Sequence, residues 1–183
     1  TQLLRVPQVD SGLRYDISPD DQRIVFAWNK TDTWELWTMS LRGGQSSRRS
    51  NPLHNEEIAS SQQTLLATTS HIIGAKFSPR FSPDGTKLAC ALDPDGSESY
   101  HIYIHNFQTN TSFDLTPNIA YAHQPNFAWS PDGEKLAVLS DRHGQFALHL
   151  LPTDGTPGRL LKNVFHPCWD VTWSPDGQWL ALE

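Results

Sequence analysis

The stretch that decides the fold is Phe127-Ala128-Trp129-Ser130-Pro131-Asp132-Gly133-Glu134-Lys135-Leu136-Ala137. Two aromatic residues stand at alternate positions before its turn, and an apolar run follows the turn, as expected for two strands joined by a tight hairpin. Proline presets φ for the first central turn position, aspartate accepts hydrogen bonds from backbone N–H groups ahead of it, and glycine adopts positive φ. The stretch therefore predicts a β-hairpin whose first strand turns Phe127 and Trp129 inward.

The same phrase occurs four times along the chain. The four prolines are 64, 48 and 44 residues apart, and a period in the mid-forties matches one four-stranded blade of a β-propeller. Alternate residues before each turn predict a buried face on every inner strand; the pairs are Tyr15 with Ile17, Pro79 with Phe81, Phe127 with Trp129, and Val171 with Trp173. The four phrases are Ile17-Ser18-Pro19-Asp20-Asp21, Phe81-Ser82-Pro83-Asp84-Gly85, Trp129-Ser130-Pro131-Asp132-Gly133 and Trp173-Ser174-Pro175-Asp176-Gly177.

The segments between the phrases complete the blades. Residues 45–61 lengthen the first repeat with Ser, Asn, Glu and Arg, and we expect a surface loop there, either without fixed structure or in contact with a partner domain. Second strands are expected at 23–28, 87–92, 135–139 and 179–182, third strands at 34–39, 100–106 and 146–151, and outer strands at 65–68, 113–116 and 159–161.

The predicted fold class is all-β, a partial β-propeller of four-stranded antiparallel blades with about three full blades and part-blades at both ends. Residues 1–183 form one propeller portion, in which Leu3 and Leu4 belong to the outer strand of a preceding blade. Because a partial ring leaves strand edges open, the chain is either a fragment of a longer protein or associates with a second copy, in a closed ring or non-specifically. The boundaries are 1–10 for that outer strand, 11–69, 70–118 and 119–162 for whole blades, and 163–183 for the inner two strands of a further blade.

Composition and charge argue against several classes of function. The formal net charge is −6 and no cluster of Lys and Arg is present, which disfavours a nucleic-acid surface. No apolar run approaches 18 residues, so we expect no membrane span. Cys90 and Cys168 lack metal-binding spacing and are expected to be buried thiols, with a disulfide as the alternative.

No cofactor or metal is expected. His101 and His105 have the i, i+4 spacing of helical zinc sites, but they lie in a predicted strand. At about 3.3 Å per residue a strand holds them too far apart to share one ion. The segment Asp93-Pro94-Asp95-Gly96 lacks the full ligand run of a calcium loop and is predicted to be a hairpin turn.

The candidate contact residues precede the inner strands, near the mouth of the expected channel. They offer aromatic and hydrogen-bonding groups that suit a substrate peptide or a neighbouring domain, while the alternative is that they pack the loops between blades. These candidates are Tyr121, His123, Trp169 and Asp170.

The repeat at 127–137, with Ser140-Asp141-Arg142-His143-Gly144 after it, resembles the WD40-like propeller repeat of TolB-type proteins and of the N-terminal domains of prolyl oligopeptidase-family serine peptidases. The segments 16–20, 23–28 and 34–39 are similar to the first blade of acylaminoacyl-peptidase-like and dipeptidyl-peptidase-like members. The resemblance to that branch implies a propeller that caps an α/β-hydrolase domain of the same parent chain and restricts access to short peptides. In that family the hydrolase domain carries the catalytic Ser, Asp and His.

No catalytic residue is predicted in this chain, because it contains no Gly-x-Ser-x-Gly nucleophile elbow. Two functions follow from the resemblance. The first is a non-catalytic propeller domain of a prolyl oligopeptidase-like serine peptidase, which gates substrate access and supports the hydrolase domain in the cytoplasm. The alternative is a TolB-like propeller that binds a protein or peptide, has no attached enzyme, and lies in the periplasm or outside the cell.

Overall fold

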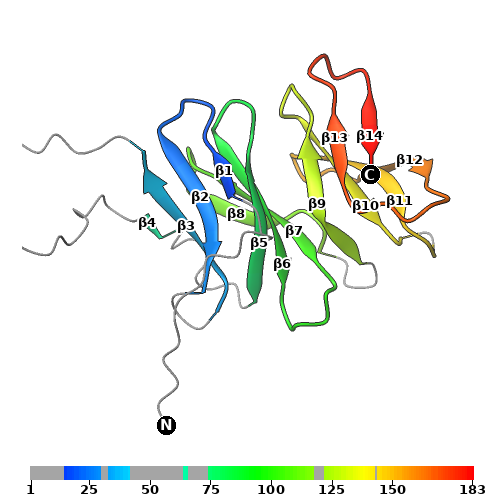
Figure 1. The fold of residues 1–183 in the computed structure, drawn as a ribbon, viewed down its shortest axis with the longest axis horizontal. Helices are drawn as coiled ribbons and strands as arrows, with labels where there is room; N and C mark the ends of the chain where they lie inside the picture. Colours follow the sequence, from blue (N-terminus) through cyan, green and yellow to red (C-terminus); the bar gives the residue numbers. More distant parts are fainter. Residues whose placement is uncertain (1–14, 30–32, 42–63, 66–73, 118–121, 143) are drawn as a thin grey trace, which may run out of the picture.

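The computed structural model describes residues 15–29, 33–41, 64–65, 74–117, 122–142 and 144–183. All regular structure in these ranges is β-strand. Four antiparallel sheets follow one another along the chain, and within each sheet the strands keep their sequence order (Figure 1). The predicted all-β class and the antiparallel four-stranded sheets of a partial propeller are confirmed.

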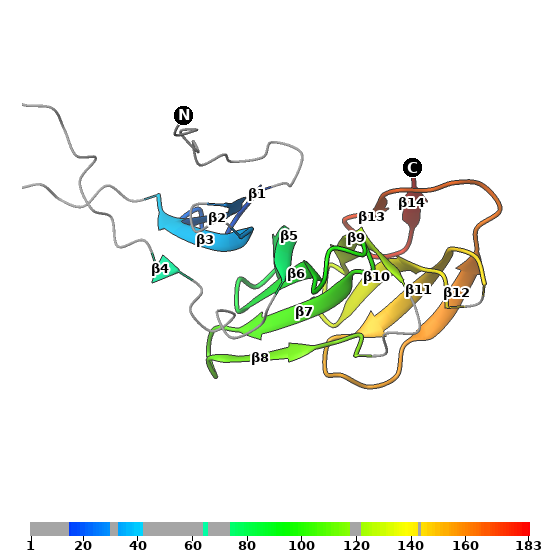
Figure 2. The same cartoon turned by 90° about the horizontal axis from the view of Figure 1, so that it is seen from below.

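We number these sheets blades 1 to 4. Blade 1 has β1 (Tyr15–Ile17), β2 (Arg23–Trp28), β3 (Glu35–Ser40) and β4 (Thr64–Leu65), and blade 2 has β5 (Ala75–Phe81), β6 (Lys87–Asp93), β7 (His101–Asn106) and β8 (Thr111–Asp114). Blade 3 has β9 (His123–Trp129), β10 (Lys135–Ser140), β11 (Ala147–Pro152) and β12 (Arg159–Asn163), and blade 4 has β13 (Val171–Trp173) and β14 (Leu180–Leu182). The first strand of each blade contacts the first strand of the next (Figures 1 and 2).

One set of hydrogen bonds around a serine closes each hairpin. In blade 3, Ser130 N donates to Lys135 O at 2.8 Å, and Ser130 Oγ accepts from Lys135 N at 2.9 Å. The same hydroxyl donates to Asp132 Oδ1 at 2.5 Å. The aspartate therefore orients the hydroxyl that accepts the Lys135 N–H at the start of the second strand. The other hairpins repeat these bonds around Ser18, Ser82 and Ser174.

The serine hydroxyl also lowers the pKa of the turn aspartate. A hydrogen bond from Ser130 is the main reason that the pKa of Asp132 lies below its ordinary value, and the backbone N–H of Glu134 adds to the effect. Donors favour the ionised carboxylate because they bind its charge. The structural role predicted for the turn aspartates is confirmed. The pKa is lowered for the same main reason at Asp20, Asp84 and Asp176.

The hairpins stack in a row from blade to blade. A Cβ added to Gly133 would lie 3.6 Å from Pro83 Cδ of the preceding hairpin, and one added to Gly85 would lie 3.3 Å from Pro19 Cδ. Gly133 has φ of 71°, where a side chain is strained. The first hairpin departs from this pattern, because Asp21 takes the glycine position with φ of 54°.

The apolar core lies between the blades. Alternate residues of a middle strand face opposite neighbours: on β6, Leu88 and Cys90 pack toward blade 1, whereas Ala89 and Ala91 pack toward blade 3. The middle strand β10 repeats this arrangement, with one face toward blade 2 and the other toward blade 4. Strands that are apolar on both faces are therefore explained by burial between two sheets.

A buried ion pair also joins blades 1 and 2. Lys76 Nζ lies 2.8 Å from Glu35 Oε2, and the lysine side chain is 1% exposed. The backbone of the same residue ties the blades as well, because Lys76 N donates to Trp34 O at 3.0 Å. Blade 1 is thus held to blade 2 by charge as well as by apolar contacts.

Most strand predictions agree with the structure to within one residue. Two outer strands are exceptions: β8 spans Thr111–Asp114 and begins two residues before the predicted 113–116, and β12 spans Arg159–Asn163 and ends two residues after the predicted 159–161. The predicted burial of Tyr15 and Ile17 is wrong, because they are 62% and 42% exposed and the described part of the chain leaves that face of β1 uncovered. The predicted outer strand at Leu3 and Leu4, the 45–61 loop, and residues 66–68 lie outside the described residues.

Candidate functional site

The two ends of the blades present different surfaces. The hairpin face holds the four serine hairpins, residues 18–22, 82–86, 130–134 and 174–178, together with the turn at 153–156. The loop face is the opposite end, where the chain enters the first strands of blades 2 to 4 and turns between second and third strands, at residues 33–35, 74–76, 93–100, 122–123, 141–142 and 165–170. Of the predicted contact residues, His123, Trp169 and Asp170 belong to the loop face, and Tyr121 lies outside the described residues.

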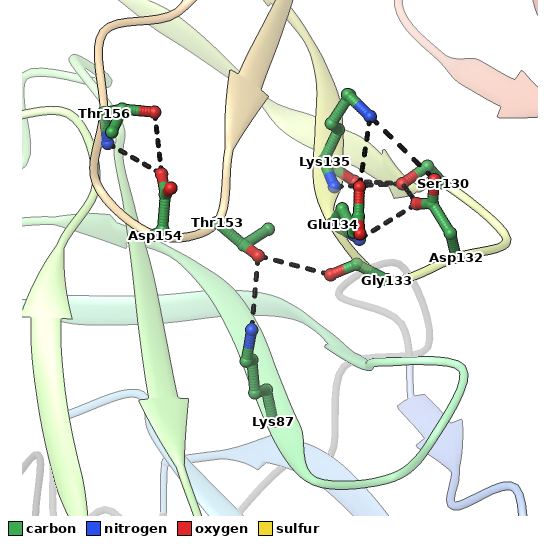
Figure 3. A network of polar contacts seen from close by, with 9 residues as sticks. All are labelled: Lys87, Ser130, Asp132, Gly133, Glu134, Lys135, Thr153, Asp154 and Thr156. Carbon is green, nitrogen blue, oxygen red and sulfur yellow. Dashed lines mark hydrogen bonds and ion pairs between the residues drawn. The ribbon is translucent and has the colours of Figure 1, made fainter.

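On the hairpin face, a groove of about 480 Å³ lies between the hairpins of blades 2 and 3. Lys87 Nζ donates to Thr153 Oγ1 at 3.2 Å, and this hydroxyl donates to Gly133 O at 3.2 Å (Figure 3). Lys135 Nζ lies 3.9 Å from Asp132 Oδ2 within one hairpin. Lys87 thus joins blade 2 to blade 3, whereas Lys135 binds carboxylates of its own hairpin.

On the loop face, His123 begins β9 and is only 8% exposed. The preceding Ala122 donates its N–H to Asp141 Oδ1 at 2.7 Å and accepts a bond from Asp141 N at 3.2 Å. Burial is the main cause that lowers the pKa of His123 to about 4, so its ring is neutral near pH 7. His123 thus faces the interior, whereas the sequence placed it on a contact surface.

Trp169 and Asp170 precede β13, and they differ in exposure. The Trp169 ring is 62% exposed, whereas its backbone is fixed, with N donating to Glu183 O at 2.6 Å and O accepting from Asn126 Nδ2 at 2.7 Å. Asp170 Oδ1 accepts from Val171 N at 2.9 Å, so the carboxylate caps the start of the strand. An exposed indole on a fixed backbone suits a protein or peptide contact, because little side-chain freedom is lost on binding.

The inner strands line a second groove, of about 340 Å³, which includes Asp170. Trp129 Nε1 donates to Arg80 O at 3.0 Å, and Trp173 Nε1 donates to Ala128 O at 3.3 Å. Each indole therefore ties its strand to the first strand of the preceding blade. Trp129, Trp173 and Arg80 also line the groove, which gives its wall aromatic surface and a cation.

The histidines and cysteines form no metal centre in the described part of the chain, where no group of three or more His, Cys, Asp or Glu side chains is arranged to hold an ion. His101 Nδ1 lies 2.7 Å from Asp114 Oδ2, and His105 Nδ1 lies 2.9 Å from Ser112 Oγ, so each histidine of β7 has its own partner on β8. Both cysteines are free thiols; Cys90 is buried, as predicted, and Cys168 is half-buried. Burial raises the pKa of Cys90 to about 12, so it is unreactive.

The structure brings together only part of the predicted contact set. Asp170 lines the inner groove, and Trp169 is exposed and is not part of the groove lining. His123 lies inside the protein, and Tyr121 lies outside the described residues. Sequence reasoning missed Arg80 as a groove residue. The repeat contained a signal for it, because Arg80 directly precedes the phrase at a position occupied by Asp16, Ala128 and Thr172 in the other copies.

Comparison with known proteins identifies the family. The family model described as the TolB beta propeller domain matches residues 50–183, which is more than half of the chain. The chain belongs to the TolB β-propeller domain family. The resemblance of its repeats to TolB-type propellers is therefore confirmed, and this TolB-type propeller has relatives in both predicted branches. In the part of the chain that the structure describes, no helix is long and apolar enough to cross a membrane.

Two curated relatives represent those branches. Over 105 residues, 55% of the chain, it is 35% identical to the "Uncharacterized peptidase YuxL" of Bacillus subtilis, of which it covers 16%. Over 124 residues, 67% of the chain, it is 30% identical to the "Tol-Pal system protein TolB" of Francisella tularensis, of which it covers 27%. The chain thus spans a small part of the length of each relative.

Solved structures share the fold at low sequence identity. A putative TolB from Agrobacterium tumefaciens matches 92% of this chain and 52% of its own, with a TM-score of 0.69 and 17% identity. A puromycin-hydrolysing peptidase from Mycobacterium tuberculosis matches 97% of this chain and 29% of its own, with a TM-score of 0.66 and 17% identity. The same blade arrangement therefore occurs both in a protein described as a TolB and in one described as a peptidase.

Proposed function

We propose that this TolB-type propeller is the non-catalytic domain of a prolyl oligopeptidase-like serine peptidase, where it limits substrate access and supports an α/β-hydrolase domain of the parent chain. The observation that carries the proposal is the inner groove beside the loop face, with Trp129, Trp173, Arg80 and Asp170 in its lining. Aromatic walls with one cation and one carboxylate suit an extended peptide, which offers apolar side chains and backbone polar groups. The similarity to the YuxL peptidase supports the same function.

The groove contributes binding without chemistry. Its arginine and carboxylate lie among tryptophans whose indole N–H groups are engaged by backbone carbonyls, and the chain lacks a nucleophile elbow. Substrate contacts in this groove act on KM and on the length of peptide admitted, whereas hydrolysis takes place in the hydrolase domain.

The proposal is tested on the full-length parent protein with a short chromogenic peptide, a peptide of about 30 residues, and a small ester. We expect Arg80→Ala, which removes the cation of the groove, to change kcat/KM for the peptides several-fold and to leave ester hydrolysis unchanged, because the ester needs no groove. Arg159→Ala is the matched control, since this exposed arginine lies outside the groove lining. Equal effects of Arg80→Ala on all three substrates, or a parent without hydrolase activity, contradict the proposal.

The second candidate is a protein-binding propeller with no attached enzyme. The exposed indole of Trp169 and the similarity to TolB of Francisella tularensis favour it. A parent reading frame that lacks a downstream Gly-x-Ser-x-Gly with later Asp and His, together with a secretion signal, supports this candidate over the peptidase. A complete catalytic set opposes it.

A further inference from the structure

Three buried histidines from three strands gather where blade 2 meets blade 3. His101 begins β7, His123 begins β9 and His149 lies within β11, and their exposed fractions are 8%, 8% and 1%. On β11, His149 alternates with Leu151, which packs in the core between the two blades. The charges of His101 and His149 both act on His123, so the three rings form one electrostatic group.

His123 is the member least able to accept a proton. Its ring is hydrogen-bonded to the backbone of Tyr100, while its Nδ1 is buried and has no hydrogen-bond partner among the described residues. Protonation would place a cation at a nitrogen without an acceptor, and Arg142 nearby adds repulsion. A buried charge without a partner is costly, so acid favours any state that exposes this ring.

The other charged groups around the cluster do not neutralise His123. Asp114 on β8 binds His101 Nδ1 at 2.7 Å, and Asp141 accepts the N–H of Ala122. Asp93 ends β6 and Glu98 lies on the turn before β7; burial is the main cause that raises the pKa of Tyr100, and the charges of these two carboxylates add to it. Each described carboxylate near the cluster therefore already acts on another group.

A bulge separates the backbone at His123 from the regular pairing of its strand. On β9, Phe127 pairs with Val138 and His123 pairs with Ser140, so three residues of β9 bulge out against one residue of β10. Bulged residues leave the hydrogen-bonded ladder, and the first residue of the strand is held by a single register position beyond the bulge. This end of β9 is the natural place for local opening.

We propose that His123, buried beside His101 and His149, makes the joint between blades 2 and 3 acid-sensitive, so that the His123 end of β9 opens as the pH falls from 7 to 5. The pKa of His123 is lowered to about 4 in the fold, against an ordinary value of 6.5. The unfolded or open state therefore binds more protons, and the stabilisation present above pH 6.5 is lost as the pH falls toward 4. The inference does not rest on the proposed function, because it concerns the fold alone.

Hydrogen exchange of the full-length protein at pH 7 and pH 5, expressed as protection factors corrected for intrinsic rates, tests the inference. For amides of residues 122–129, we expect the opening constant to rise roughly tenfold to thirtyfold between these pH values. H123Q removes the titrating ring and abolishes most of this rise. H166Q, at an exposed histidine, keeps it.

The experiment distinguishes the effect of His123 from that of two other kinds of titrating group, His105 and the turn aspartates. Burial also lowers the pKa of His105, which lies beside Phe107 on the blade 1 side, so its effect appears in peptides of blades 1 and 2 instead of at 122–129. The turn aspartates have lowered pKa values and titrate below the pH 5 limit.

Unchanged protection at 122–129, or a rise that persists in H123Q, overturns the inference. If H123Q does not fold, NMR titration of the wild-type His123 ring decides: a ring still neutral at pH 5 supports the inference, and one that titrates near 6.5 overturns it.

Discussion

The hairpin face and the loop face are built on different principles. On the hairpin face, four hairpins use the same serine and aspartate with nearly the same bond lengths, and each of the last three rests on the proline of the hairpin before it. On the loop face each blade has its own solution: the Lys76–Glu35 pair, the Asp141 contacts of Ala122, and the Glu183 contacts of Trp169. Repetition thus indicates a role in stability, and variation is where specific contacts can arise.

We expect the largest loss of stability from a change in the buried Lys76–Glu35 pair of the loop face. This pair shows that the loop face contributes to stability as well as to specific contacts. Lys76→Met removes the partner of Glu35 at the joint of blades 1 and 2, so we expect a loss of about 3 kcal/mol in the free energy of unfolding. Urea denaturation measures the loss, and adding Glu35→Leu should restore part of it because no charge is then left unpaired. A loss below about 1 kcal/mol would show that the pair contributes little.

The repeated hairpins predict a smaller and more uniform effect. Ser130→Ala leaves the Lys135 N–H without its hydroxyl acceptor, and we expect a loss of about 1 to 2 kcal/mol in the free energy of unfolding. The equivalent change at Ser82 should give a similar loss, because its bonds are the same. Ser97→Ala, at an exposed turn, is the control, with an expected change below about 0.5 kcal/mol. Markedly unequal losses at the two hairpins would contradict the equivalence of the repeats.

The one irregular hairpin offers a stabilising change. Asp21 has φ of 54° where the other hairpins have glycine, so Asp21→Gly should raise the free energy of unfolding by about 0.5 to 1 kcal/mol. Gly133→Asp is the reverse substitution at an equivalent turn and should lower it by about 1 kcal/mol or more. Chemical denaturation measures the change in the free energy of unfolding for both variants. A lower free energy of unfolding in Asp21→Gly would show that Asp21 is not strained at the glycine position of the turn.

The weakest expected effect is a pH dependence of the hairpin face. Hydrogen bonds from the serines lower the pKa of the turn aspartates below 3.8, so their contribution is present above that pH and is lost as the pH falls below it. The urea midpoint of the wild type should therefore decrease more between pH 5 and pH 3 than that of Ser130→Ala. Equal slopes for the two proteins would show that the serine contact has no influence on the carboxylate.

The sequence predicted the hairpin face better than the loop face, and the reason is physical. Ser, Pro, Asp and Gly at fixed positions encode one local turn, which needs no information about distant residues. The burial of His123 depends instead on His101, His149 and Tyr100 from two other strands, which no local pattern encodes. The exposure of Tyr15 was missed for the same reason. Tyr15 has the sequence position of a buried inner-strand residue, but no described part of the chain covers its side chain.

Cross-linking between hairpins tests the stacking of successive blades most directly. Lys87 of blade 2 reaches Thr153 of blade 3, with Nζ and Oγ1 3.2 Å apart, whereas Arg23 of blade 1 reaches Gly85 O of blade 2. In a protein without its native cysteines, the pair Lys87→Cys with Thr153→Cys should join rapidly through a short bifunctional thiol reagent, and the pair Arg23→Cys with Thr153→Cys should not. Efficient joining of the second pair without the first would contradict radially stacked blades.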